Sequence, residues 1–177
     1  QITAQPTPTV AKTVAAASIN PVTGEWTINY AVTVTNPSST LSTRYSLGDQ
    51  LQFGTGITIV GIPDITSTSA TPSEAWNGTT VTSVIVDEPL PAGAVHSYSV
   101  TVVANTVTVT DANVSDMDCA LTSGETGTGF RNVATVNSGV AAPVFAVGCT
   151  AANDPSVVKT IAQTPVQDPD TGVWTVI

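Results

Sequence analysis

The chain has 177 residues, of which 41% are hydrophobic and only 10% charged, against roughly 25% charged in an average soluble protein. Lys and Arg number 4 and Asp and Glu 13, so the net charge is -9. This balance excludes nucleic acid and anionic membrane surfaces as partners, because the chain lacks the cations that would neutralise phosphates. No apolar run approaches the ~18 residues that span a bilayer. Gln1 does not begin a signal peptide, so we expect any targeting signal to have been removed or to lie outside this chain.

The composition favours an all-β protein. Thr and Val are abundant, and their branched side chains suit a pleated, half-buried surface. The usual helix formers Glu, Lys, Arg, Gln and Leu are scarce, and no stretch has the apolar spacing of a helix. Stretches that alternate with period two, separated by Gly- and Pro-containing turns, predict about eight strands and hence an immunoglobulin-like β-sandwich, with a closed barrel as the alternative. The predicted strands are Thr9–Ala16, Trp26–Thr35, Ser42–Phe53, Ile57–Ile62, Thr79–Asp87, His96–Thr110, Asn132–Asn137 and Val144–Cys149.

An internal repeat divides the chain. Residues 7–15 recur as residues 154–162 at an offset of 147, and residues 21–28 recur as residues 169–176 at an offset of 148. A loop insertion of one residue explains the change of offset, and the second copy stops at Ile177, halfway through its second strand. Such a period indicates a tandem array.

The repeat predicts the domain organisation. We expect an N-terminal extension or linker at 1–6, one complete sandwich at 7–150, and a linker with the start of the following, incomplete repeat at 151–177. Residues 154–177 are interpreted either as an unfinished domain or as strands donated to a neighbouring chain.

The two lysines, Lys12 and Lys159, occupy equivalent positions of the repeat. Lys12 shares strand parity with Val10 and Val14, so all three side chains point to one face. If that face is the core, the amine is buried, which is costly unless it is paired or neutral. The alternative is a charge on an edge strand that discourages aggregation.

The two cysteines, Cys119 and Cys149, suit one disulfide better than a metal site, since the chain has no CxxC motif and one histidine. A Lys-poor, Thr-rich chain with a disulfide is typical of a secreted or surface-exposed protein. Two reduced, buried thiols in a cytosolic protein are the alternative interpretation.

Several segments resemble one family in order and spacing. They are Val10–Val14, Trp26–Asn36, Tyr45–Leu51, Leu90–Ala94 and Arg131–Val136. Together they resemble the DUF11-type repeats of bacterial, especially Gram-positive, surface proteins, over most of residues 8–137. The segment at Asp49 lacks the proline that the family has there.

The resemblance implies an intramolecular Lys–Asn isopeptide bond, and the chemistry of the residues agrees with it. A lysine in an apolar interior has a lowered pKa, so the neutral amine of Lys12 could attack the side-chain amide of Asn132. A carboxyl group kept protonated by the same surroundings would polarise that amide, and Asp49 is the predicted proton donor. In the alternative reading, Asn132 is only a turn or strand-end residue.

Other candidate sites are weaker. Asp111, Asp116 and Asp118 offer oxygen ligands for Ca²⁺, but they lack the EF-hand spacing, and a solvated acidic loop is the favoured interpretation. His96 has no catalytic triad around it. The three tryptophans, Trp26, Trp76 and Trp174, are interpreted as packing residues rather than binding platforms.

The sequence therefore predicts a structural repeat of an extracellular stalk, adhesin shaft or filament on a bacterial surface. We expect no cofactor, and no enzymatic activity beyond a single-turnover cross-link. The expected partners are neighbouring repeats of the same chain or neighbouring subunits. The alternative function is a glycan- or protein-binding adhesive module that uses loops such as Thr66–Thr80.

Overall fold

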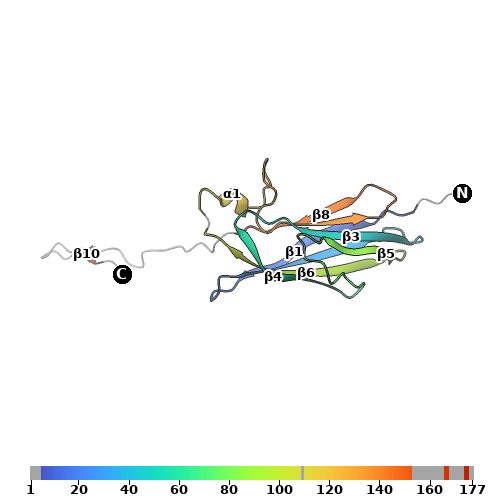
Figure 1. Cartoon of the computed structure of the whole chain (residues 1–177), viewed down its shortest axis with the longest axis horizontal. Helices are drawn as coiled ribbons and strands as arrows, with labels where there is room; N and C mark the ends of the chain where they lie inside the picture. Colours follow the sequence, from blue (N-terminus) through green and yellow to red (C-terminus); the bar gives the residue numbers. More distant parts are fainter. Residues whose placement is uncertain (1–4, 109, 153–165, 168–173, 176–177) are drawn as a thin grey trace.

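The computed structural model describes residues 5–108, 110–152, 166–167 and 174–175. Within this part, two four-stranded antiparallel sheets pack face to face (Figure 1). This confirms the predicted immunoglobulin-like β-sandwich, and the two separate sheets exclude a closed barrel. The first sheet has the order β1 (Thr9–Ile19), β2 (Trp26–Thr35), β6 (Val95–Thr106), β4 (Ile57–Ser67), and the second has β5 (Ser83–Leu90), β3 (Thr43–Leu51), β7 (Asn132–Asn137), β8 (Val144–Gly148).

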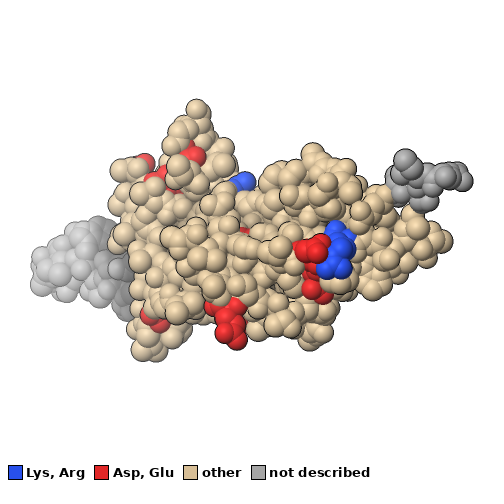
Figure 2. Space-filling view, turned by 45° about the vertical axis from the view of Figure 1, so that its right-hand side comes forward, with Lys and Arg blue, Asp and Glu red and all other residues tan. Residues whose placement is uncertain are grey.

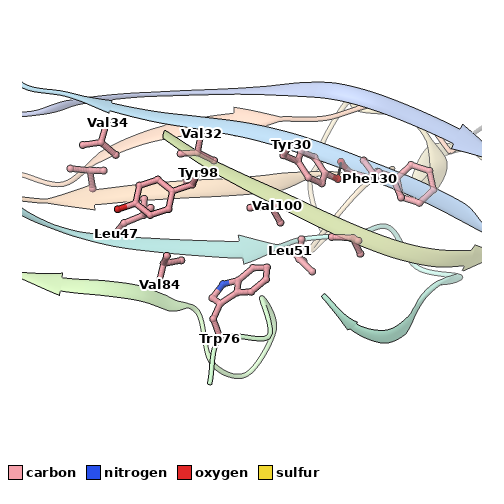
Figure 3. Close-up of a cluster of buried hydrophobic side chains, with 14 of the residues drawn as sticks. Tyr30, Val32, Val34, Leu47, Leu51, Trp76, Val84, Tyr98, Val100 and Phe130 are labelled. Atoms are coloured by element: carbon pink, nitrogen blue, oxygen red, sulfur yellow. Dashed lines mark hydrogen bonds between the residues drawn. The ribbon is translucent and has the colours of Figure 1, made fainter. Parts of the chain in front are cut away.

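Strict alternation along the central strands builds the core. In β2 and β6 every second side chain is buried, and the intervening ones face outward. Burial of a Val, Leu or Ile side chain stabilises a fold by about 1.5–3 kcal/mol. Figure 3 shows these side chains from both sheets meeting between the layers. The fully buried members include Tyr30, Val32, Val34, Leu47, Val84, Val100 and Phe130.

Several elements differ from the sequence prediction. β1 runs past the predicted Ala16 to Ile19, after a register shift between Val14 and Ala16. β4 does not end at Ile62 but continues to Ser67 after a register shift between Val60 and Asp64, where Gly61 has a φ of 71°. β5 begins later than predicted, and it runs through Pro89, which an edge strand tolerates because proline lacks only the N–H donor. A short helix, α1 (Val114–Met117), follows β6, which ends before the predicted Thr110.

The register of the last two strands reproduces that of the first two. β9 (Val166–Gln167) pairs with β10 (Trp174–Thr175) so that Trp174 lies opposite Gln167. At the offset of 148, this is the pairing of Trp26 with Ile19 in β1 and β2. The backbone pairing is thus repeated together with the sequence. The remainder of 153–177, including Lys159 and most of the segment considered for strand donation, lies outside the described residues.

The surface carries few charges. The face in Figure 2 is mostly neither acidic nor basic. Within the described part of the chain, Arg44 and Asp87 form an exposed ion pair. Among the described residues, no helix is long and apolar enough to cross a bilayer.

The burial of all three tyrosines predicts alkaline instability. Burial raises the pKa of Tyr30, Tyr45 and Tyr98 above the ordinary value of 10.0. Since the folded-state pKa is raised, the stabilisation is fully present below pH 10 and is lost as the pH rises above it. We expect phenolate absorbance to stay low above pH 10 while the protein is folded and to appear together with cooperative unfolding. Phenolate formation near pH 10 with unchanged circular dichroism would contradict the buried placement.

Candidate functional site

Lys12 points into the sandwich from β1, an edge strand of the first sheet. The residue is 6% exposed and its side chain is fully buried. Its strand neighbours of the same parity, Val10 and Val14, pack against the core, while Thr9, Ala11 and Thr13 are exposed. Lys12 is therefore not a solvated edge charge, and its amine needs a partner inside the protein.

Asp49 supplies that partner from β3 of the opposite sheet. It lies in the buried alternation of β3 between Leu47 and Leu51 and is 1% exposed. Its Oδ2 accepts a hydrogen bond from Nζ of Lys12. The second carboxyl oxygen, Oδ1, has no hydrogen-bond partner. Lys12 and Asp49 thus join the two sheets through a charged or proton-sharing contact within a largely apolar interior.

Asn132 lies beside Asp49 at the start of β7. Its neighbour two residues on, Ala134, pairs with Asp49, and Asn132 itself pairs with Leu51. Asn132 and Asp49 are therefore diagonal neighbours on the inward face of one sheet, a spacing across which long side chains interact. Asn132 is 0% exposed, and neither its Nδ2 nor its Oδ1 has a hydrogen-bond partner. A buried unsatisfied polar group costs about 1–3 kcal/mol.

Burial shifts both ionisable groups toward their neutral forms. Desolvation lowers the pKa of Lys12, against the opposing effect of Asp49. Desolvation likewise raises the pKa of Asp49, against the opposing effect of Lys12. The nearby Asn132 side chain also lowers the pKa of Asp49, but by less than Lys12 does. The Asn132 amide nevertheless completes no hydrogen bond. Both shifts run in the direction that a neutral amine beside a protonated carboxyl group requires.

Tyr30 and Trp76 enclose the pair. The ring of Tyr30 lies 5.3 Å from Nζ of Lys12, and its hydroxyl donates to the carbonyl of Phe130 at 2.7 Å (Figure 3). The indole N–H of Trp76 donates to the carbonyl of Asp49 at 2.9 Å. Tyr30 thus fixes the backbone two residues before Asn132, and Trp76 fixes the backbone of Asp49 itself.

The burial of Trp76 bears on the proposed adhesive loop. Trp76 is 2% exposed and belongs to the core, so it is not available as a binding platform. The loop does border a groove of about 410 Å³ lined by Ile62, Pro63, Asp64, Ile65, Pro72, Ser73, Glu74 and Trp76. Trp26 packs on Phe130 with ring centroids 5.3 Å apart.

Cys119 and Cys149 form the predicted disulfide. It joins the segment after α1 to the residue that follows β8. The described part of the chain contains no free cysteine, so the interpretation as reduced thiols is wrong.

The remaining predicted site residues do not converge on a site. Asp111, Asp116 and Asp118 are not brought together, and no group of three possible metal ligands occurs in the described ranges. Asp118 instead accepts hydrogen bonds from the backbone N–H of Ala120 and the hydroxyl of Thr128. The ring of His96 contacts the hydroxyl of Tyr45 at 2.9 Å through Nδ1.

Sequence reasoning missed three residues around Lys12. Tyr30 and Gly148 contact the lysine, and Trp76 fixes the backbone of Asp49. Alternation marked Tyr30 as inward-facing, but nothing local in the sequence indicated that Gly148 or Trp76 lies at this site.

The comparisons with known proteins identify no family for this chain. No family model matches the chain, and no curated protein matches it. One solved structure that resembles it is a variant of the major pilin subunit of Bacillus cereus, with 16% identity and a TM-score of 0.42. The match covers 81% of this chain and 40% of the pilin chain.

The buried pair predicts a characteristic pH dependence in a variant. In Lys12→Met, burial raises the pKa of Asp49 with no opposing lysine. Because this folded-state pKa exceeds the ordinary 3.8, its contribution to stability is present at acid pH and is lost as the pH rises through the folded-state value. We expect Lys12→Met to be about 3 kcal/mol less stable than Lys12→Met/Asp49→Asn at neutral pH.

Thermal unfolding of both variants from acid to neutral pH checks this expectation. The difference should disappear below the ordinary carboxyl pKa, where both side chains are neutral. Both variants lack Lys12, so a cross-link affects neither. Parallel stability curves at all pH values would show that Asp49 titrates normally and is not buried.

Proposed function

We propose that this chain is a structural repeat of a filament, stalk or adhesin shaft on a bacterial surface, cross-linked internally between Lys12 and Asn132. The observation that carries the proposal is the buried Lys12–Asp49 contact beside an Asn132 amide without any hydrogen-bond partner. A site that leaves three polar atoms of Asp49 and Asn132 unsatisfied is a costly way to stabilise a fold. It is a suitable arrangement for a reaction that consumes the amine.

The proposed reaction is a condensation without redox change. The neutral Nζ of Lys12 attacks the side-chain amide carbon of Asn132, and a new C–N bond forms as the bond to Nδ2 breaks. Asp49 donates its proton to the departing nitrogen and recovers one from the lysine nitrogen, so that ammonia leaves and Asp49 ends as it began. The product replaces a buried titratable amine by a neutral amide, and the apolar surroundings favour that exchange.

The proposed bond would stabilise the fold mainly by restricting the unfolded chain. It would close a loop between positions 12 and 132. By the loop-entropy relation for cross-links, closing this loop would raise the free energy of unfolding by about 5 kcal/mol. It would also join the edge strand β1 of one sheet to β7 of the other.

The arrangement of the chain supports a load-bearing role. The first described residues lie at one end of the sandwich, and the chain leaves β8 toward the opposite end (Figure 1). The repeat and the repeated register of β9 and β10 favour further domains in line. A surface with few charges and a disulfide suits an extracellular location.

The adhesive alternative rests on the groove beside β4. Its exposed Ile62, together with Asp64 and Glu74, offers a surface for a ligand. Saturable binding of a glycan or host protein that Ile62→Ser abolishes would favour this function over the shaft.

The cross-link predicts a mass about 17 Da below the calculated value after reduction of the disulfide, because one ammonia is lost. Cyclisation of Gln1 releases ammonia too, so the measurement uses a Gln1→Ala background. We expect the loss to disappear in Lys12→Met, Asn132→Ala and Asp49→Ala. Asn137→Ala, an exposed change on the same strand, is the matched control that should keep it. An unshifted mass in the parent chain would refute the cross-link.

Single-molecule pulling tests the mechanical role. With both links present, force passes from Lys12 to Asn132, then along thirteen residue steps to Cys119, and through the disulfide to Cys149. Unfolding can then release at most about 45 Å of chain. In Asn132→Ala the 107 residue-to-residue steps from Lys12 to Cys119 are released, up to about 370 Å of chain. Equal extension of the two proteins would contradict a load-bearing cross-link.

A further inference from the structure

Three segments form a clamp at the end of the sandwich where β7 begins and β8 ends. We define the clamp as residues 116–119, 128–131 and 149–152. The disulfide joins the first segment to the third. Backbone hydrogen bonds run from Phe130 to Thr150 at 2.9 Å, from Ala152 to Met117 at 2.8 Å, and from Gly129 to Asp116 at 2.7 Å. All three segments are thus held to one another independently of the two sheets.

The clamp borders the residues of the proposed reaction. Asn132 follows its second segment directly, and Gly148 immediately precedes its third. These two residues face each other as the last pair of the β7–β8 ladder. A shift of the clamp therefore moves Asn132 and Gly148 together.

Gly148 lies directly against Lys12. A Cβ at this position would lie 3.4 Å from Cγ of Lys12, 3.3 Å from the carbonyl carbon of Thr13 and 3.2 Å from Cδ1 of Tyr30. Its φ is not positive, so the backbone conformation does not require glycine. The absence of a side chain lets β8 lie close to β1 and Tyr30, because a Cβ would require the Tyr30 ring or the Thr13 backbone to give by a few tenths of an ångström, with the stem of Lys12 in contact beside them.

Tyr30 connects the same clamp to the amine. Its hydroxyl donates to the carbonyl of Phe130 in the clamp, and its ring lies beside Nζ of Lys12. The clamp thus borders the nucleophile through Tyr30 and Gly148, and the target amide through Asn132.

We propose that Gly148 and the clamp closed by the Cys119–Cys149 disulfide position Lys12 and Asn132 for condensation, so that forming the disulfide accelerates the cross-link. This inference rests on the proposed function. The disulfide takes no part in the bond changes: its two thiols lose two electrons and two protons to an external disulfide oxidant, and the later condensation releases ammonia alone. Gly148 and the cysteines are positioning residues, because none of them touches the reacting carbon in the proposed step.

The test follows the cross-link as it forms. The full chain with Gln1→Ala is made by cell-free synthesis, with oxidised glutathione as the oxidant or with a reductant. Samples are quenched in acid at intervals, reduced, and weighed by mass spectrometry. Misplacement of a reacting group by 1 Å can lower a rate by about 100-fold. The backbone hydrogen bonds of the clamp remain when the disulfide is reduced, so the misplacement should be smaller. We therefore expect the reduced chain to react about tenfold more slowly than the oxidised chain.

Two variants separate positioning from general stability. Gly148→Ala, with its disulfide intact, is expected to react about tenfold more slowly, because its methyl group displaces Lys12 or β8. Val144→Ala is the matched control: it lies on the inward face at the other end of β8, opposite Val136, and should react at the parent rate. Cys119→Ser/Cys149→Ser should match the reduced chain. If that double variant does not fold, as judged by circular dichroism, Gly148→Ala carries the test.

The pH profile of the rate distinguishes positioning from partial unfolding. If a variant merely has a smaller folded fraction, its rate falls by the same factor at every pH at which the fold is intact. If Lys12 has moved relative to Asp49, the pH at which the rate is half-maximal changes instead. We expect that change in Gly148→Ala and not in Val144→Ala. Equal rates in oxidised and reduced chains, with Gly148→Ala like its control, would overturn the positioning role and leave the cross-link standing. No mass loss in any sample would overturn both.

Discussion

The contact between Lys12 and Asp49 is the constraint on which the rest of this structure depends. Two ionisable groups face each other between sheets whose remaining inward side chains are almost all apolar. Removing either group would leave the other buried and alone, which is strongly destabilising. The pair therefore sets how β1 sits against β3 across the sandwich. The unsatisfied amide of Asn132 beside it makes the site chemically unusual as well as structurally necessary.

The position of the site explains why two covalent links would suffice to protect the whole sandwich. The disulfide ties the end of β8 to the segment after α1, and the proposed amide bond would tie β1 to β7. Together they would leave a covalent route of thirteen residues across the domain. In the proposed load-bearing role, these two links would carry force that the noncovalent contacts between the sheets would otherwise bear alone.

The repeat gives the same chemistry a wider meaning. The equivalent of the first hairpin returns 148 residues later with the same backbone register. Its lysine, Lys159, occupies the position of Lys12 in the sequence. An array built from such units would carry one lysine at this position of each repeat.

The sequence by itself determined the alternation of each strand, and therefore which side chains of β1, β2, β3, β6 and β7 face inward, because strand parity is a local property. It also determined the repeat, the face that Lys12 shares with Val10 and Val14, and the pair of cysteines. It did not predict α1, the continuation of β4 beyond its bulge, or the passage of β5 through Pro89, since these depend on edge position and loop packing. Only the tertiary structure decided that Asp49 meets Lys12, that Trp76 donates a hydrogen bond to the Asp49 backbone, and that Gly148 lies close to β1 and Tyr30. The physical reason is that the alignment of two sheets face to face depends on the packing of all their side chains at once, and no local pattern encodes it.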